Sequence, residues 1–170
     1  MDKRYLLIIV IILICSVNLF LISISSDIIG GASVNFKDYT FSIPKNFDLL
    51  SSDDQYVKLN NPDIGWIHIT YDDIRENNDY KHRINYIENR SDMTILRNGT
   101  LNVGNTTVYS VFFQRQDSNS IINDSSFIFD QYGHRFTISV AGYDYSSYNE
   151  IVDTVIFLIE SLRHNYKFNY

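Results

Sequence analysis

The chain opens with a long apolar run that decides where the rest of the protein can fold. Residues 5–25 hold one strongly polar side chain, Asn18, besides a few serines. About 20 apolar residues in a helix, at roughly 1.5 Å each, span the hydrocarbon layer of a membrane, which is about 30 Å thick. Lys3 and Arg4 precede the run, so the positive-inside rule keeps residues 1–4 in the cytoplasm and exports the residues beyond the run. The sequence therefore predicts a single-pass membrane protein whose C-terminal part is extracellular.

Three other interpretations of this run stay open. A signal peptide has an apolar core of about 7–15 residues, which is shorter than this run. Ser23 and Ser25 nevertheless form a small-x-small pattern, which permits cleavage after Ser25 and secretion. A lipoprotein would be acylated at Cys15, but the bulky Ile14 before it disfavours this. A buried helix of a cytosolic protein does not need apolar residues on every face, so the retained anchor fits the run best.

The part of the chain after the run has the size of one domain and an acidic composition. Its 144 residues carry 12 basic and 19 acidic side chains, a net charge of −7. This balance argues against binding nucleic acid, whose phosphates need a basic face, and against docking on anionic lipid headgroups. Cys15 is the only cysteine, so the exported part has no disulfide within the chain and no thiol nucleophile.

Alternating apolar and polar side chains predict that much of the exported part is strand. The expected strands are 39–43, 47–50, 55–59, 66–71, two or three over 93–116, and a hairpin over 126–143 that turns at 132–133. In 66–71 both faces carry bulk, with Trp66 and His68 on one face and isoleucines on the other. We therefore expect a central strand that is covered on both sides. The polar stretch 117–126 is expected to be a loop.

Helical spacing of apolar residues predicts two helices, at 77–90 and 146–164. The expected caps are Asn77 or Asn78 for the first helix, and Asp144, Ser146 or Ser147 for the second. Residues 26–35 are expected to be a short spacer, 36–164 one extracellular domain, and 165–170 a tail. The predicted fold class is α+β, a central antiparallel β-sheet with a helix on each face, preceded by the transmembrane helix.

Several segments together resemble a known family. They are YTFSIPKNF at 39–47, IHITY at 67–71, LNVGNTTVYSVFF at 101–113, FIFDQYGHRFTISVA at 127–141 and IVDTVIFLIESL at 151–162. These segments are similar to PsbP-like domains, and most of all to the small exported PsbP-like proteins of archaea, over about residues 36–164. The resemblance implies an α/β/α sandwich around an antiparallel sheet.

The better-known members of that family are binding subunits, namely an extrinsic subunit of photosystem II and the related Ran-binding Mog proteins. No catalytic residue set defines the fold, so the resemblance implies no catalytic residue for this chain. The sequence gives no sign of a photosynthetic partner, which leaves the photosystem role unsupported, because a shared fold does not supply function.

Four Asn-x-Ser/Thr sequons lie in the part that is predicted to be exported: Asn89, Asn98, Asn105 and Asn123. An exported domain can carry glycans at such sites, which makes all four possible N-glycosylation sites. A chain rich in Asn and Ser also produces sequons by chance. We expect all four at loops or element ends, where a glycan fits.

No motif for catalysis or for metal binding stands out. The four histidines form no ligand pair, and His68 is expected to be a half-buried strand residue. The carboxylates Asp72, Asp73, Glu76 and Asp79 are interpreted as solvated charge, with weak binding of Ca²⁺ or Mg²⁺ as the alternative. The sequence contains no nucleophile elbow and no phosphate-binding loop. We therefore expect no catalytic residue, no cofactor and no metal.

Aromatic residues gather near the last helix. One group precedes it and another forms the tail: Tyr143, Tyr145, Tyr148, Tyr166, Phe168 and Tyr170. These side chains either cover the sheet edge and the helix ends or form a binding surface, since tyrosine suits recognition.

The leading functional hypothesis is a non-enzymatic, membrane-anchored binding or accessory module of the cell envelope. Its expected partners are the membrane, through residues 5–25, and an envelope protein; nucleic acid is not expected, and the sequence identifies no small-molecule ligand. The alternatives are an envelope hydrolase and a structural tether in a membrane complex. A deep pocket that places His68 or His134 against a carboxylate and a hydroxyl would favour the hydrolase.

The N-terminal run leads to a prediction about location. The full chain should fractionate with membranes, and protease added to intact cells should digest its C-terminal part, because that part is exported. A variant that lacks residues 5–25 should instead stay in the cytosol, protected from the protease. Recovery of the intact full chain from the cytosol in protease-resistant form would refute the anchor.

Overall fold

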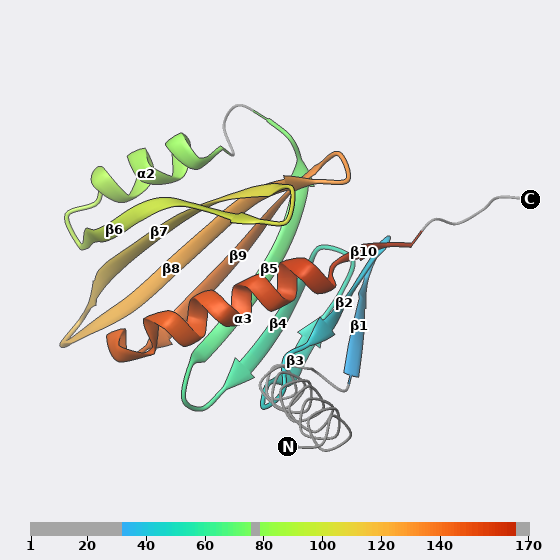
Figure 1. Cartoon of the computed structure of the whole chain (residues 1–170). Coiled ribbons are helices and arrows are strands. Elements are labelled where there is room, and N and C mark those ends of the chain that lie inside the picture. The colour runs from blue at the N-terminus through green and yellow to red at the C-terminus, as the bar shows by residue number, and fades with distance from the viewer. Residues whose placement is uncertain (1–31, 76–78, 166–170) are drawn as a thin grey trace, which may run out of the picture.

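Antiparallel strands make up most of the described part of the chain, which is residues 32–75 and 79–165 of the computed structural model (Figure 1). Residues 5–25, the predicted anchor, lie outside the described residues. So do Asn77 and Asn78, the predicted caps of the first helix, and the tail beyond residue 165. Among the described residues, no helix combines the length and the apolar composition that crossing a membrane requires.

Seven strands form the large sheet, in the order β3-β4-β5-β9-β8-β7-β6, with every neighbouring pair antiparallel. Their bounds are β3 Asp48–Ser52, β4 Tyr56–Asn61, β5 Gly65–Asp73, β6 Met93–Val103, β7 Thr106–Asp117, β8 Ser120–Gln131 and β9 His134–Tyr143. The stretch 93–116 thus holds two strands. The loop predicted at 117–126 is wrong, because β7 and β8 continue into it and only Ser118 and Asn119 lie between them.

The predicted hairpin at the C-terminal end of the sheet is present as β8 and β9. Gln131 pairs with His134, so the turn between the strands has two residues. Tyr132 and Gly133 both have positive φ, at 53° and 79°, which is the conformation of the two-residue turns that match the twist of paired strands.

A second, three-stranded sheet has the order β1-β2-β10. Its strands are β1 Ala32–Phe36, β2 Tyr39–Ile43 and β10 Arg163–His164. β1 begins at Ala32, within the stretch that the sequence predicts as a spacer. β2 therefore lies between the first and the last described strands of the chain.

Two α-helices are described, α2 at Tyr80–Glu88 and α3 at Tyr148–Ser161. Asp79 itself caps α2, because its carboxylate accepts a hydrogen bond of 2.7 Å from the backbone N–H of His82. A short 3₁₀ turn, η2 at Tyr145–Ser147, leads into α3. Ser147 occupies the cap position of α3, but its side chain makes no capping hydrogen bond.

The main core lies between one face of the large sheet and the layer formed by α3 and the small sheet (Figure 1). Every second side chain on the strands points into it, such as Ile67 and Ile69 on β5 and Ile138 on β9. From α3, Ile151 and Val155 are fully buried against this face. This burial sets the register of the strands, because a one-residue slip would turn the apolar set outward.

The opposite face of the large sheet is only partly covered. Ile87 of α2 packs with Val111 and Phe113 of β7 in a small separate cluster. On β5, Trp66 and His68 are exposed, although their strand is central in the sheet. The expectation that this strand is covered on both sides is therefore wrong, because α2 reaches only the β6–β7 side of the sheet. We call the uncovered part, carried by β4, β5 and β9, the open face.

Gly65 at the start of β5 gives a prediction about stability. It has φ of +93°, and a Cβ at this position would overlap the carbonyl oxygen of Ala141 on β9. We expect Gly65→Ala to lower the free energy of unfolding by about 2–5 kcal/mol, since it adds backbone strain to a steric overlap.

Gly104→Ala is the matched control, because Gly104 has φ of +58° and a Cβ there meets no atom within 4 Å. It should cost about 1 kcal/mol, the strain of the left-handed conformation alone. Thermal unfolding of the full chain in detergent, followed by near-ultraviolet circular dichroism, measures both variants. Equal losses in the two variants would contradict the overlap at Gly65.

Candidate functional site

Strand register arranges the open face in rows of side chains that cross the sheet. Lys58 on β4 pairs with His68 on β5, and His68 pairs with Ser139 on β9. Ser139 in turn pairs with Ser126 on β8. Paired residues of antiparallel strands place their side chains on the same face. Residues more than 60 positions apart in the chain thus become neighbours in one row.

Aromatic side chains mark the β4–β5 side of the open face. The indole of Trp66 is 48% exposed, and the ammonium of Lys58 lies 3.7 Å from its ring centre. The rings of Tyr56 and His68 lie next to each other, 5.2 Å apart. These four side chains line a hollow of about 610 Å³ that extends to Ser139. An exposed tryptophan beside a cation is a feature of binding surfaces rather than of a passive exterior.

Arg83 of α2 marks the other side of the open face. Its guanidinium carbon lies 5.3 Å from the ring centre of Phe113 and 5.5 Å from that of Tyr86. Within the described residues its Nε has no hydrogen-bond partner and its guanidinium has no carboxylate partner. Burial lowers the pKa of Arg83. Arg83 lines a hollow of about 330 Å³ that also reaches Ser139. The two hollows therefore adjoin at Ser139, and we call them together the groove.

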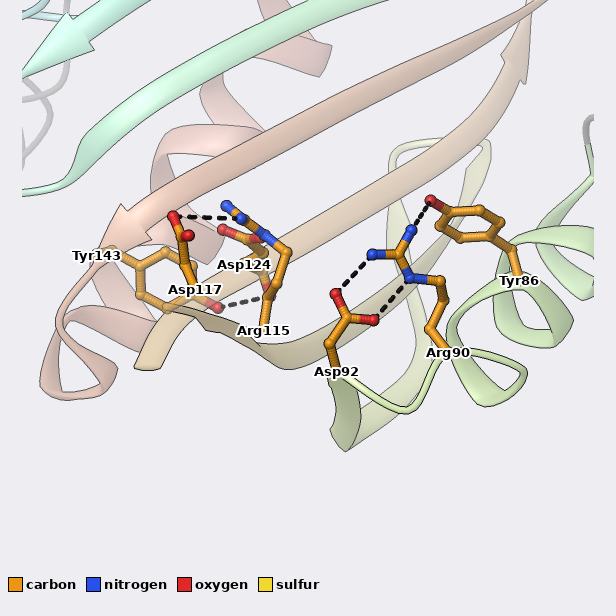
Figure 2. Close-up of polar contacts among 7 residues, drawn as sticks. All are labelled: Tyr86, Arg90, Asp92, Arg115, Asp117, Asp124 and Tyr143. Carbon is orange, nitrogen blue, oxygen red and sulfur yellow. Dashed lines mark hydrogen bonds and ion pairs between the residues drawn. The ribbon is translucent and has the colours of Figure 1, made fainter. Parts of the chain in front are cut away.

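A half-buried ion pair links two strands at this groove, and its arginine also lines the hollow at Trp66. Arg115 on β7 donates to the carboxylate of Asp124 on β8 at 3.1 Å, and it also lies 3.8 Å from Asp117 (Figure 2). Asp124 is only 8% exposed, and its carbonyl accepts a hydrogen bond of 3.2 Å from the hydroxyl of Tyr143. The charge of Arg115 is thus used inside the fold. It is not free for a ligand in the way that Lys58 is.

The second ion pair in Figure 2 lies outside the groove. Arg90 donates two hydrogen bonds to Asp92, at 2.7 and 2.6 Å, and one of 3.3 Å to the hydroxyl of Tyr86. Arg90 is exposed, and its hydrogen bonds to Asp92 raise the pKa of the guanidinium. Arg90 is therefore a useful comparison for Arg83, which lies on the same segment but faces the sheet.

Protonation decides the charge of the groove. Burial, and after it the nearby charge of Lys58, lower the pKa of His68 from its usual value of 6.5. His68 is consequently neutral at pH 7. The cationic side chains that line the groove are then Lys58, Arg83 and Arg115, of which Arg115 is paired with Asp124.

His134 meets part of the condition that would favour a hydrolase. Its Nδ1 lies 2.6 Å from the hydroxyl of Tyr39, and its Nε2 lies 3.8 Å from the carboxylate of Asp73. Tyr39 is only 1% exposed, however, and burial raises the pKa of its hydroxyl, so this group is a poor nucleophile. The contact instead joins β2 of the small sheet to β9 of the large sheet. His68 packs against the ring of Tyr56.

The four sequon asparagines occupy different environments. Asn89 ends α2 and Asn105 lies in the β6–β7 turn, and both are exposed. Asn98 is exposed but lies within the edge strand β6. Asn123 lies within β8, where its side-chain amide donates to the carbonyl of Tyr143 at 3.0 Å. The expectation that all four lie at loops or element ends is therefore wrong for Asn98 and Asn123.

The carboxylates that the sequence groups together serve separate roles. Asp72 and Asp73 lie 3.6 and 3.4 Å from Arg75, and Asp79 caps α2. Glu76 lies outside the described residues. Within residues 32–75 and 79–165, no three His, Cys, Asp or Glu side chains are close enough to hold a metal ion.

Of the aromatic residues that the sequence offers as a binding surface, Tyr143 and Tyr148 have described side chains, and Tyr166, Phe168 and Tyr170 lie outside the described residues. Tyr143 is buried, and the half-buried ring of Tyr148 lies 4.5 Å from that of Phe112. The aromatic residues of the groove, Trp66 and Tyr56, were missed as a site. The sequence did offer one sign of this site. Bulky polar side chains alternate with the isoleucines of 66–71, and such a pattern is found on exposed strand faces as well as on covered ones.

No protein-family model matches the chain, and no curated protein matches it. Solved structures do match, and they include the cyanobacterial PsbP of Synechocystis, at 9% identity and a TM-score of 0.49, over 78% of this chain and 90% of that one. LpqN of Mycobacterium tuberculosis, described as involved in cell envelope biogenesis, is similar at 11% identity and a TM-score of 0.52, over 79% and 90%.

A protein of Bacteroides thetaiotaomicron is similar at 13% identity and a TM-score of 0.51, over 76% of this chain and 46% of that one. At these identities the similarity concerns the fold alone, and it rests on the two structures with TM-scores above 0.5. The cyanobacterial PsbP is one of the structures to which this chain is similar, while LpqN and the Bacteroides protein carry the argument that the fold is shared. The archaeal and Mog-related parts of the resemblance stay predictions.

The ion pair at the groove gives a prediction. Arg115→Gln leaves the buried carboxylate of Asp124 without its cation, so the free energy of unfolding should fall by about 1–3 kcal/mol. Arg90→Gln removes the same charge from an exposed pair and should change the thermal midpoint too little to measure. A larger loss for Arg90→Gln than for Arg115→Gln would contradict this ranking.

Proposed function

We propose that this protein is a membrane-anchored binding module of the cell envelope, and that it binds its partner in the groove of the open face without catalysing a reaction. The observation that carries the proposal is the groove itself. It joins an exposed tryptophan to two cations that have no carboxylate partner among the described residues, Lys58 and Arg83.

The physical cost of this arrangement supports a binding role. An exposed indole and an unpaired, half-buried guanidinium contribute little to the stability of the free protein. Both become favourable when a ligand covers the ring and brings an anion to the cation. The groove also lies on rigid strands, so its side chains are held in place before the ligand arrives.

The proposed location rests on residues 5–25. In this interpretation the anchor crosses the membrane and the described part of the chain lies outside the cell, so its partner is an envelope component. LpqN, which shares the fold, is described as involved in cell envelope biogenesis. The non-enzymatic part of the proposal draws on His134, whose hydroxyl partner is the buried Tyr39. We also propose that the fold is an α/β/α sandwich, in which α2 covers only part of one face of the large sheet.

A photo-crosslinking amino acid tests the proposal in the full chain in native membranes. Placed at His68 on the open face, it should give an adduct with the partner, because His68 lines the hollow between Trp66 and Ser139. Placed at Glu160, which is exposed on α3 over the opposite face, it should give none. Mass spectrometry of the purified chain detects small and large adducts alike. Adducts at Glu160 and none at His68 would overturn the proposed face.

A further inference from the structure

Trp66 and Arg83 lie at the two ends of one row across the sheet. Trp66 pairs with Ala141, and Ala141 pairs with Asp124. Asp124 pairs with Phe113, and the guanidinium of Arg83 lies over the Phe113 ring. The row spans three strand spacings of about 4.8 Å, so its ends are about 14 Å apart. A ligand that touches both ends is therefore an extended chain and not a single small ring.

Small hydroxyl side chains form the floor of the groove beside this row. Thr137 and Ser139 line the hollow at Arg83, and Ser139 also lines the hollow at Trp66. Each hydroxyl donates one hydrogen bond and accepts others. The hydroxyl of Ser139 has a partner in that of Ser126, at 3.5 Å, and an acyl chain would offer neither Thr137 nor Ser139 a further hydrogen bond. A ligand that carries hydroxyl groups of its own offers such bonds to both.

The charges of the groove favour a ligand of negative charge. Lys58 and Arg83 have no carboxylate partner among the described residues, whereas Arg115 is paired with Asp124. Two carboxylates lie near Arg83. Asp79 lines its hollow and caps α2, and the charge of Asp124 acts on the guanidinium although Asp124 is paired with Arg115. The whole chain has a net charge of −6, so it does not attract an anion from a distance. The two cations therefore act only on a ligand that is already in the groove.

Resting on the proposed function, we propose that the ligand of the groove is an acidic saccharide chain. Sugar rings stack their C–H faces on Trp66, sugar hydroxyls bond to Thr137 and Ser139, and ring carboxylates meet Lys58 and Arg83. Arginine suits this role because its planar fork matches the geometry of a carboxylate. An acidic peptide would offer the charge but not the hydroxyl groups, so it serves as the contrasting probe.

Binding of polygalacturonate to the purified full chain in a nonionic detergent tests the proposal. This polymer carries one carboxylate on each sugar ring. Dextran, a neutral glucan, and polyglutamate, an acidic peptide, are the two contrasting probes. At about 0.15 M salt, where charges are screened beyond roughly 8 Å, polygalacturonate should bind at least about tenfold more tightly than either.

Variants at the two ends of the row locate the site. Arg83→Gln and Trp66→Ser should each weaken the binding of polygalacturonate by at least about tenfold. Arg90→Gln, which removes the same charge from an exposed position outside the groove, should change it by less than about twofold. Trp66 is largely exposed, so Trp66→Ser keeps the test valid if Arg83→Gln unfolds. Thermal unfolding of each variant checks its fold.

Three results would overturn the saccharide assignment. They are the absence of polygalacturonate binding, equal binding of polyglutamate, and an equal loss in Arg90→Gln and Arg83→Gln. The crosslinking experiment separates this failure from that of the proposed function. An adduct at His68 of another chemical class removes the saccharide and keeps the binding face, whereas no adduct at His68 removes both.

Discussion

The alternation of side chains along paired strands is the constraint on which the rest of this structure depends. On β5 it sends Ile67 and Ile69 into the core and leaves Trp66 and His68 on the open face. Because the strands are held in one register, the same division continues across the neighbouring strands. The core and the groove therefore lie on opposite faces of the same strands. A change that moved the register of β5 would lose the stability and the site together.

Much of the fold could be predicted from the sequence, because local periodicity reports on strands and helices. Residues 39–43 and the α3 segment were found in this way, as was the turn at Tyr132 and Gly133. The stretch 117–126 was not. Its small polar side chains give no strand signal, yet Ser125 and Ser126 are buried because β7 and β9 pair with β8 on either side. Pairing with the neighbouring strands, and not the local sequence, therefore makes this segment a strand.

The groove was beyond the reach of sequence analysis for a different reason. Lys58, Trp66 and Arg83 come from β4, β5 and α2, and only the register of the sheet and the position of α2 bring them to one face. The sequence did show that Trp66 and His68 share a side of their strand. It could not show that α2 stops short of covering that side, because the reach of a helix over a sheet depends on how the two pack.

The position of β2 between β1 and β10 has a consequence for how the protein acquires its structure. Thr40 on β2 bonds to Asn165, which lies 125 residues further along the chain. The small sheet, and with it one wall of the core, cannot close until residues 163–165 have left the ribosome. A chain with such distant contacts folds slowly and late. Until that segment is made, the apolar wall of the core stays open, and exposed apolar surface of this kind favours aggregation.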